Sequence, residues 1–487
     1  MPRVNSLSDR DTLVNLALIA TKDVIDKLKT LKDSGHKFKK TPARKFSEHD
    51  GIQPTFRKIE TSSYKDGYDD FGSIFAFREQ WEAKYRYTDI EGFTEILEFA
   101  SQHEELMRFL NLNSEDNNRP HLVEISVGEL LTTASAQYIF DNGWEVEDDK
   151  LHTTVEKLVN WWVLPDVPIE LVVPILNVSF EVDHFALDNS TRVERMSDDL
   201  KLSCWPSRPR VNDHETVQRM ATHVVILSHW TLPNLSALGW MFTTKDEPID
   251  APTLDRFFQA LSTIIPEPSG YLQVAYRPLG WSHTFSGPLP EIIQGPLIPQ
   301  HSSKMKGADE PGRILSTDET LLVQQAFTAL QSNEKTISIA GQRLWEAERR
   351  TSDVDRIIDL CIGIEALVSG ESPGDTTYKI SVRTAAVLAD LGINDPNEVM
   401  KAAKTVYALR SAVVHGREKP SAAEVTLGGE TLNTIDAARY FLRNLLHARL
   451  RTPELTPDQI DARIIGGALA LWQQTSTERS ADESTTI

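Results

Sequence analysis

Cysteine is nearly absent from this sequence, and several other signals are missing with it. The 487 residues include two cysteines, Cys204 and Cys361, far apart and outside any CxxC or Cys/His spacing typical of zinc sites. A reducing compartment is therefore expected. The N-terminus lacks the layout of a signal peptide, and no run of 18 apolar residues is present that could span a membrane. These absences predict a soluble, cytoplasmic protein without a membrane partner.

Positive charge is also in short supply. The chain has 51 Lys and Arg residues against 71 Asp and Glu residues, which gives a net charge of −20. Such a surface repels nucleic acid at long range, so any nucleic-acid site must be a local basic island. Hydrophobic residues at 40% and charged residues at 25% are ordinary for a globular protein. The length predicts about two to four domains.

The common catalytic motifs are missing or out of context. The sequence has neither HExxH nor GxGxxG. Its GxSxG match, Gly370–Gly374, puts Pro373 after Ser372, where a nucleophile elbow needs a backbone N–H. The stretch Gly307–Arg313 has arginine where a phosphate-binding loop has lysine. The histidines show no metal-ligand spacing, so neither a metal nor a cofactor is predicted.

Hydrophobic periodicity divides the chain into parts, of which residues 1–165 are predicted to be mostly helical. The amphipathic helices expected there are Leu13–Leu31, Phe93–Leu112 and Leu151–Val163. The basic stretch Lys37–Lys45 is predicted to be a loop, because glycine and proline flank or interrupt it. Trp161 and Trp162, on the third helix, are expected in the core.

Residues 166–310 are expected to form a mixed strand and helix region that ends in a linker. Alternating apolar and polar residues predict strands within Ile169–Leu187, and further strand candidates are His223–Leu232 and Tyr271–Tyr276. A short helix is predicted at Thr253–Ile265, and the glycine- and proline-rich stretch Gly287–Pro311 is predicted to be the linker.

Residues 311–475 are strongly helical in pattern, and the polar residues 476–487 are predicted to be a disordered tail. The helices expected in this part are Thr317–Trp345, Asp353–Val368, Lys379–Leu391, Pro396–His415, Thr434–Leu450 and Pro457–Gln474. The predicted fold class is therefore α+β and mainly α, with a helical bundle after a mixed α/β N-terminal region.

One of these helices carries the functional signal. Asp395 is a good N-cap, Pro396 suits the first helical position, and Gly416 suits the helix end. The apolar residues step by four and three along one face, but Arg410 occupies one position of that face. A charge there needs a buried partner, a bound anion or water in a cleft. His415 follows in the last turn.

Glu365 lies in a comparable position on the helix Asp353–Val368, which is apolar on nearly all sides. We therefore predict that Glu365 contacts Arg410. Two interpretations stay open: Arg410 is a structural ion-pair residue and His415 an ordinary helix-end residue, or the two form a site. Five residues rotate by about 140° in an ideal helix. Arg410 and His415 therefore converge only through the long arginine side chain or through unwinding near Gly416.

Similar Arg–His spacing occurs elsewhere, at Arg44 and His49, at Arg208 and His214, and at Arg277 and His283. The first pair lies in the predicted basic loop. The other two begin with Arg-Pro, which is unfavourable inside a helix. The context of a strong amphipathic helix therefore separates Arg410 and His415 from these pairs.

Three blocks resemble the HEPN domain, in particular its ApeA-like branch in prokaryotic anti-phage proteins. They are GIEALVSG (Gly363–Gly370), TYKISVRTAAVL (Thr377–Leu388) and VYALRSAVVHG (Val406–Gly416), and they occur in the family's order. In that family an Arg-x4–6-His motif closes a long helix. The three blocks lie within Gly363–Gly416. The family domain that the resemblance implies would take up most of residues 311–475, as a HEPN-type helical bundle that dimerises and brings two motifs together.

By this resemblance, Arg410 and His415 are the catalytic residues of a metal-independent endoribonuclease, a toxin-like effector of anti-phage defence by abortive infection. Ser411 and Glu365 map onto supporting positions. The implied partners are a second copy of the chain and an RNA substrate, of which tRNA is one candidate. Two alternatives stay open: a non-catalytic HEPN module for dimerisation or nucleotide sensing, and the toxin half of a toxin–antitoxin pair.

The local charge agrees with an RNA site. Residues 376–420 carry seven basic and four acidic residues, a net charge of +3 within a chain of −20. A basic island around the motif is what RNA binding needs. Lys379, Arg383 and Arg417 are the predicted RNA-binding residues.

Overall fold

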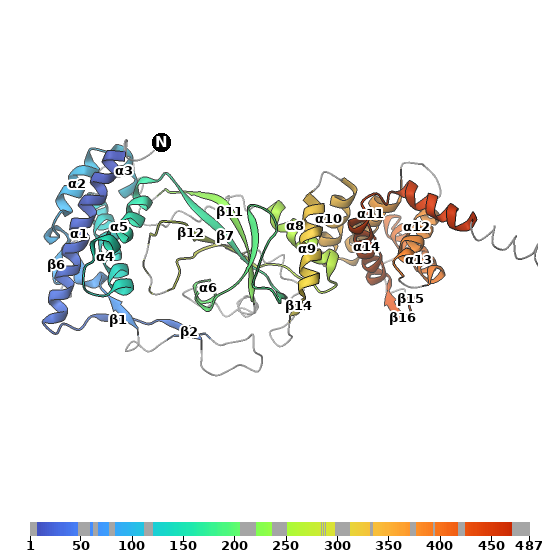
Figure 1. Ribbon diagram of the computed structural model, residues 1–487, viewed down its shortest axis with the longest axis horizontal. Helices are drawn as coiled ribbons and strands as arrows, with labels where there is room; N and C mark the ends of the chain where they lie inside the picture. The colour runs from blue at the N-terminus through green and yellow to red at the C-terminus, as the bar shows by residue number, and fades with distance from the viewer. Residues whose placement is uncertain are drawn as a thin grey trace, which may run out of the picture.

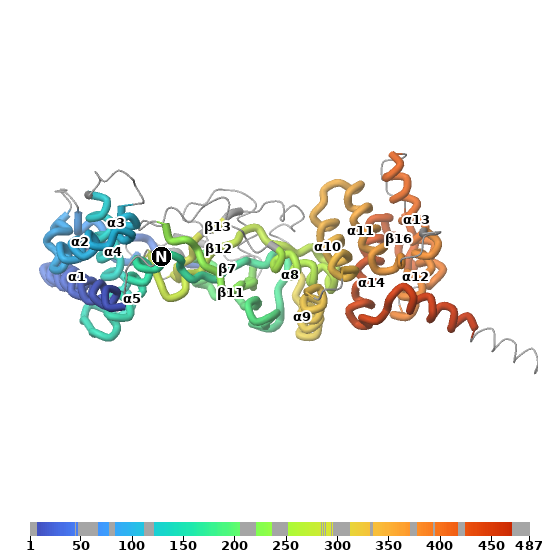
Figure 2. Tube along the Cα trace, turned by 90° about the horizontal axis from the view of Figure 1, so that it is seen from above, coloured from blue at the N-terminus to red at the C-terminus, as the bar shows by residue number. Residues whose placement is uncertain are grey.

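The computed structural model arranges the chain as three parts in a row along the long axis of the molecule (Figure 1). A helical N-terminal part, a central sheet and a helical C-terminal part follow one another, and the view from above shows the same order (Figure 2). The fold class is α+β and mainly α, as predicted. The structure describes residues 7–46, 59–61, 67–76, 83–111, 120–204, 221–235, 251–283, 285, 287, 289–297, 312–331, 335–370, 376–392, 395–416 and 424–469.

Helices dominate the N-terminal part. They are α1 (Leu7–Asp33), α2 (Phe93–Ser101), α3 (Glu104–Leu110), α4 (Pro120–Asn142) and α5 (Asp148–Val163). The helices predicted at Leu13–Leu31 and Leu151–Val163 are confirmed as α1 and α5. The single helix predicted at Phe93–Leu112 is instead two helices, because the chain leaves the helical path at His103, whose backbone is extended.

Helix α4 has no counterpart among the predicted helices. Its buried face includes Ser126 and Ser135, whose hydroxyls donate hydrogen bonds to the carbonyls of Leu110 and Leu131. A serine that is satisfied in this way is compatible with the core, but it interrupts the apolar stripe by which a buried helix is recognised.

The aromatic core joins the N-terminal part to the sheet. Trp161 and Trp162 are 0% and 2% exposed, which confirms that they are core residues. Trp161 stacks on Trp281 from the central part, with ring centroids 4.9 Å apart.

The basic stretch Lys37–Lys45 contains two short strands, so the loop prediction is wrong there. The paired short strands are β1 (Lys39–Thr41) with β4 (Tyr68–Asp70) and β2 (Arg44–Phe46) with β3 (Ile59–Thr61), both antiparallel. Lys40 also forms an ion pair with Asp69 at 2.8 Å. Both partner strands come later in the sequence, so the stretch itself does not reveal them. The other short elements are η2 (Gly72–Ile74), β5 (Phe75–Ala76), β6 (Tyr85–Arg86) and η3 (Tyr87–Asp89).

The central part is a six-stranded antiparallel sheet with the strand order β13-β12-β7-β11-β10-β9. The strands are β7 (Asp166–Pro174), β9 (His184–Ala186), β10 (Thr191–Arg195), β11 (His223–Pro233), β12 (Gln273–Pro278) and β13 (Ile293–Leu297). The three strand segments predicted here are confirmed. The linker predicted at Gly287–Pro311 is wrong in its first part, because β13 pairs there with the edge of β12.

The two faces of the sheet enter different cores. Leu171 and Val173 of β7 belong to the large core that runs through the molecule, whereas Val172 belongs to a smaller core with α6 (Asp198–Ser203). This alternation is the period of two that the sequence shows. On the way to the C-terminal part, β8 (Val178–Phe180) pairs in parallel with β14 (Arg313–Leu315). Both cysteines, Cys204 and Cys361, are buried and free.

The C-terminal part is a helical bundle. Its helices are α9 (Thr317–Gln331), α10 (Lys335–Arg349), α11 (Asp353–Val368), α12 (Thr376–Asp390), α13 (Pro396–Val414) and α14 (Thr434–Arg451), followed by a helix over residues 457–469. These confirm the predicted helices, except that Thr317–Trp345 is divided into α9 and α10. A hairpin of β15 (Glu424–Leu427) and β16 (Glu430–Asn433) lies between α13 and α14 in the chain and was not predicted. The polar tail, residues 476–487, lies outside the described residues.

The bundle also includes a helix from before the predicted boundary at residue 310. This helix, α8 (Ala251–Ile264), confirms the prediction at Thr253–Ile265 and packs on α9, α10 and α14. A buried network fixes it: Ser262 donates to the Glu348 carboxylate at 2.6 Å, and Arg443 donates to the Ser262 carbonyl at 2.8 Å. Among the described helices, none is long and apolar enough to cross a membrane.

Candidate functional site

Two well-capped helices build the candidate site. The side chain of Asp395 accepts hydrogen bonds from the backbone N–H groups of Asn397 and Glu398 at 2.7 and 3.3 Å, and Pro396 stands in the first turn of α13. Helix α11 is capped by Ser352 in the same way. Caps of this kind stabilise the first turn and so define the residue at which each helix begins.

The structure brings Arg410 and Glu365 together, as predicted. A guanidinium nitrogen of Arg410 lies 3.7 Å from a Glu365 carboxylate oxygen. This separation makes an ion pair but exceeds the usual length of a hydrogen bond. The two side chains are 34% and 26% exposed, so both open partly to solvent. The ion pair is therefore loose and half-buried, and it is not enclosed between the two helices.

Arg410 lacks hydrogen-bond partners within the described part of the chain. Its Nε is buried and has no acceptor there. The Tyr407 hydroxyl, one turn earlier on α13, donates to the Cys361 carbonyl at 3.3 Å. Burial raises the pKa of Tyr407, which stays a neutral phenol. The Nε atoms of Arg343, Arg356 and Arg439 are also buried without a described acceptor, but their guanidiniums form close ion pairs of 2.8, 2.8 and 3.0 Å through another nitrogen. Among the described residues, Arg410 has only the contact of 3.7 Å, so its guanidinium has donors available for an anion.

The charge of Glu365 is also incompletely compensated by its partner Arg410. Burial raises the pKa of its carboxyl group, and Arg410 acts in the opposite direction without cancelling this effect. The long ion pair thus compensates the two charges incompletely. An anion bound beside Arg410 would meet a cation that Glu365 does not saturate.

His415 and Ser411 lie on a different side of the helix. Both are exposed, and His415 is the C-cap residue, whose backbone N–H donates to the Ser411 carbonyl at 3.1 Å. Gly416 turns the chain with a φ of +65°. The helix remains regular to Val414, so Arg410 and His415 keep the rotation of about 140° expected for five residues. Within one chain the structure does not bring the two motif residues together.

The predicted RNA-binding residues differ in their surroundings. Arg383 is 5% exposed, and its guanidinium binds both carboxylate oxygens of Asp461 and the carbonyls of Val368 and Ser369. Arg383 is therefore not available to RNA, and this prediction is corrected. Lys379, one turn earlier on α12, is partly exposed. Arg417 lies outside the described residues.

The rival Arg–His pairs behave as unrelated residues where the structure describes them. Arg277 lies in β12 and binds Glu170 and Glu194. His283 lies against Trp281 and forms an ion pair with Glu291. His49 and the Arg208–His214 pair lie outside the described residues.

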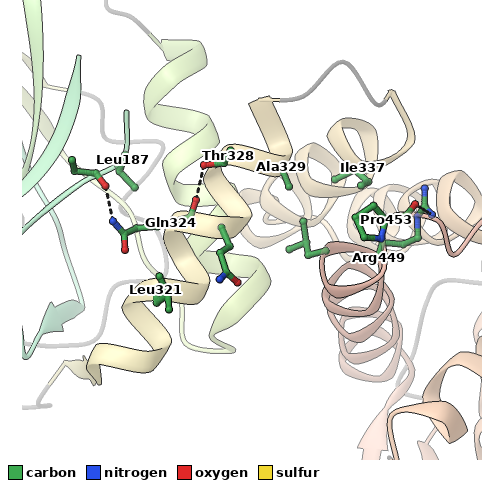
Figure 3. Close-up of a pocket in the computed structure, with 11 residues that line it drawn as sticks. Leu187, Leu321, Gln324, Thr328, Ala329, Ile337, Arg449 and Pro453 are labelled. Atoms are coloured by element: carbon green, nitrogen blue, oxygen red, sulfur yellow. Dashed lines mark hydrogen bonds between the residues drawn. The ribbon is translucent and has the colours of Figure 1, made fainter. Parts of the chain in front are cut away.

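A cavity at the junction of sheet and bundle was not foreseen from the sequence. It has a volume of about 640 Å³ and opens between Leu187, helix α9 and the end of α14 (Figure 3). Its walls are mainly apolar, and Gln324 closes one side by donating to the Ala186 carbonyl at 2.7 Å. Its lining comes from elements distant in sequence, so no local pattern announces it. It does not include Arg410 or His415.

No protein-family model, curated protein or solved structure matches the chain. Within the described residues, no group of three or more His, Cys, Asp and Glu side chains could hold a metal ion.

Proposed function

We propose that this protein is a metal-independent endoribonuclease of the HEPN type, a cytoplasmic, toxin-like effector of anti-phage defence. Arg410 carries the proposal: a half-buried guanidinium at the end of α13 whose Nε has no acceptor in the described part of the chain. A phosphate is a natural acceptor, because guanidinium groups bind phosphate oxygens in pairs. The sequence resemblance to the HEPN motif supports the choice of RNA.

The chemistry follows from the two motif residues. The ribose 2′-oxygen attacks the adjacent phosphorus, the bond to the 5′-oxygen breaks, and a 2′,3′-cyclic phosphate remains. Histidine titrates near neutrality, so His415 can accept the 2′-hydroxyl proton or donate a proton to the leaving 5′-oxygen. Arg410 stabilises the negative charge that develops on the phosphorane. Glu365 orients Arg410, and Ser411 hydrogen-bonds the phosphate.

A second copy of the chain completes this site. In one chain Arg410 and His415 point about 140° apart, so a single bundle does not supply both to one phosphate. An isologous dimer would bring two copies of each residue to a shared cleft. We expect a dimer at micromolar concentration in light scattering, and a monomer would contradict this arrangement.

Incubation of the purified protein with total RNA and EDTA tests the activity. We expect cleavage in the presence of EDTA and products with 2′,3′-cyclic phosphate ends. Inhibition by EDTA would contradict the proposal, because the mechanism assigns proton transfer and charge stabilisation to side chains.

A further inference from the structure

The exposed side of α13 carries a stripe of residues that leads away from His415. Its members are all exposed and are spaced three or four residues apart, which places them on one face of the helix. They are Lys401, Lys404, Ala408, Ser411 and His415. At the helical rise per residue, Lys404 lies about 16 Å from His415 along this face. The stripe therefore begins at the proposed catalytic histidine and ends in two lysines.

Tyr378 extends this stripe sideways onto α12. Its side chain is 57% exposed, and the Lys404 ammonium lies over its ring at 5.5 Å from the centroid. The contact shows that the two side chains share one surface. An aromatic ring left this open offers an apolar face to a ligand.

Lys401 and Lys404 form no ion pair with any described residue. Lys379 and Arg383 on α12 instead lie near Asp461, which binds Arg383 directly and whose pKa both cations lower. The charge of Lys401 and Lys404 therefore stays available in a chain whose net charge is −20. Free lysines beside an exposed aromatic ring suit a strand of alternating phosphates and bases.

We propose that Tyr378 and Lys404 form a binding subsite for an unpaired nucleotide of the RNA strand that reaches His415. The base stacks on Tyr378, and Lys404 and Lys401 bind the flanking phosphates. A base in a duplex is stacked between its neighbours and cannot use this ring, so the substrate is single-stranded at this subsite. The inference rests on the proposed function and specifies its substrate class.

Fluorescence anisotropy with a single-stranded oligonucleotide tests the subsite. Its riboses carry 2′-O-methyl groups, which remove the attacking hydroxyl and leave binding alone to be measured. We expect Tyr378→Ala to weaken binding roughly 5- to 150-fold, the range for loss of one stacked base. Tyr378→Phe keeps the ring and should bind like wild type. Lys404→Gln should weaken binding and reduce the slope of log affinity against log salt by about 0.7.

Phe140→Ala is the matched control, because Phe140 is an aromatic residue of α4 in the N-terminal part and is 45% exposed. It should bind like wild type, and a duplex of the same sequence should be insensitive to Tyr378→Ala. Wild-type affinity of Tyr378→Ala for the single strand overturns the proposal. So does a change in dimerisation with unchanged RNA affinity, which would assign the surface to a protein contact.

Cleavage of unmodified RNA separates this inference from the proposed function. His415→Ala should bind the modified oligonucleotide like wild type and cleave nothing. If wild type cleaves RNA and Tyr378→Ala binds and cleaves equally well, the subsite is wrong and the nuclease stands. If wild type cleaves no RNA but Tyr378→Ala still weakens binding, the nuclease is wrong and the subsite stands.

Discussion

Two arginines of the C-terminal bundle occupy opposite situations. Arg383 is almost fully buried, binds a carboxylate through two nitrogens and binds the carbonyls at the end of α11 through a third. Arg410 is partly open, faces one carboxylate at 3.7 Å, and has a buried Nε without a described acceptor. Both arginines were candidates for RNA chemistry in the sequence, and only the second remains one.

The difference teaches how to assign an arginine. A guanidinium has five N–H donors and no acceptor, so its role follows from where those donors point. Arg383 uses its donors inside the fold and ties α12 to α11 and to the helix 457–469. Arg410 has donors left over at the surface, and Glu365 beside it is poorly compensated. The hydrogen-bond partners thus distinguish Arg383, whose guanidinium is bound within the fold, from Arg410, whose guanidinium has donors available for an anion.

The largest expected effect is a loss of RNA cleavage on substitution of the two motif residues, Arg410 and His415. We expect His415→Ala and Arg410→Ala each to reduce RNA cleavage by roughly 10²–10⁴-fold, the range for loss of a group that acts in the transition state. Thermal unfolding should hardly change, because His415 is exposed. Replacement of His152, an exposed histidine of α5, by alanine is the control and should leave cleavage intact. Full cleavage by His415→Ala would contradict the HEPN mechanism, because the activity would then not depend on His415.

Substitution of Arg383 should instead lower the stability of the fold. Arg383→Ala removes a bidentate ion pair between a buried guanidinium and the partly exposed Asp461, and it leaves two carbonyls without their donor. We expect the free energy of unfolding to fall by about 3 kcal/mol. Urea denaturation measures this, with Arg410→Ala as the comparison. An equal loss of unfolding free energy in Arg383→Ala and Arg410→Ala would contradict the assignment of a structural role to Arg383 alone.

Glu365 should contribute little to stability despite its charged neighbour. A sealed pair would lose about 3–5 kcal/mol on removal of one partner, but partly exposed pairs are worth about 1 kcal/mol or less. Because Glu365 and Arg410 are 26% and 34% exposed, we expect the small value for Glu365→Ala together with reduced cleavage. Urea denaturation and the RNA assay on the same preparation check both. A loss near that of Arg383→Ala would mean that the pair is structural.

The smallest expected effect is a pH dependence at the same residue. Burial raises the pKa of Glu365 above its ordinary value of 4.5, so the folded state favours the protonated carboxyl group. Its contribution to stability is therefore present below pH 4.5 and is lost as the pH rises through the raised pKa. Glu365→Gln cannot titrate, so its stability relative to wild type should increase over this rise. Parallel pH profiles of wild type and variant would show that the carboxyl group is not perturbed.

His283 shows why the structure changes the choice of controls. By spacing alone, His283→Ala would behave like wild type. In the structure His283 lies against Trp161 and Trp281 and pairs with Glu291, so we expect this variant to lose stability. His152 is the safer control because it is exposed on a helix surface.

The sequence by itself determined where α13 begins and ends and what lies at its end. Asp395, Pro396 and Gly416 act within a few residues of themselves, so their pattern is legible in the chain. The same holds for the alternation of apolar and polar residues in β7. The tertiary structure alone decided that Arg383 binds Asp461, 78 residues away, that α8 joins the bundle, and that α13 stays regular to Val414 instead of unwinding. A charged side chain often pairs with a residue that is distant in the sequence. Only the packing of the helices decides whether such a partner lies within reach.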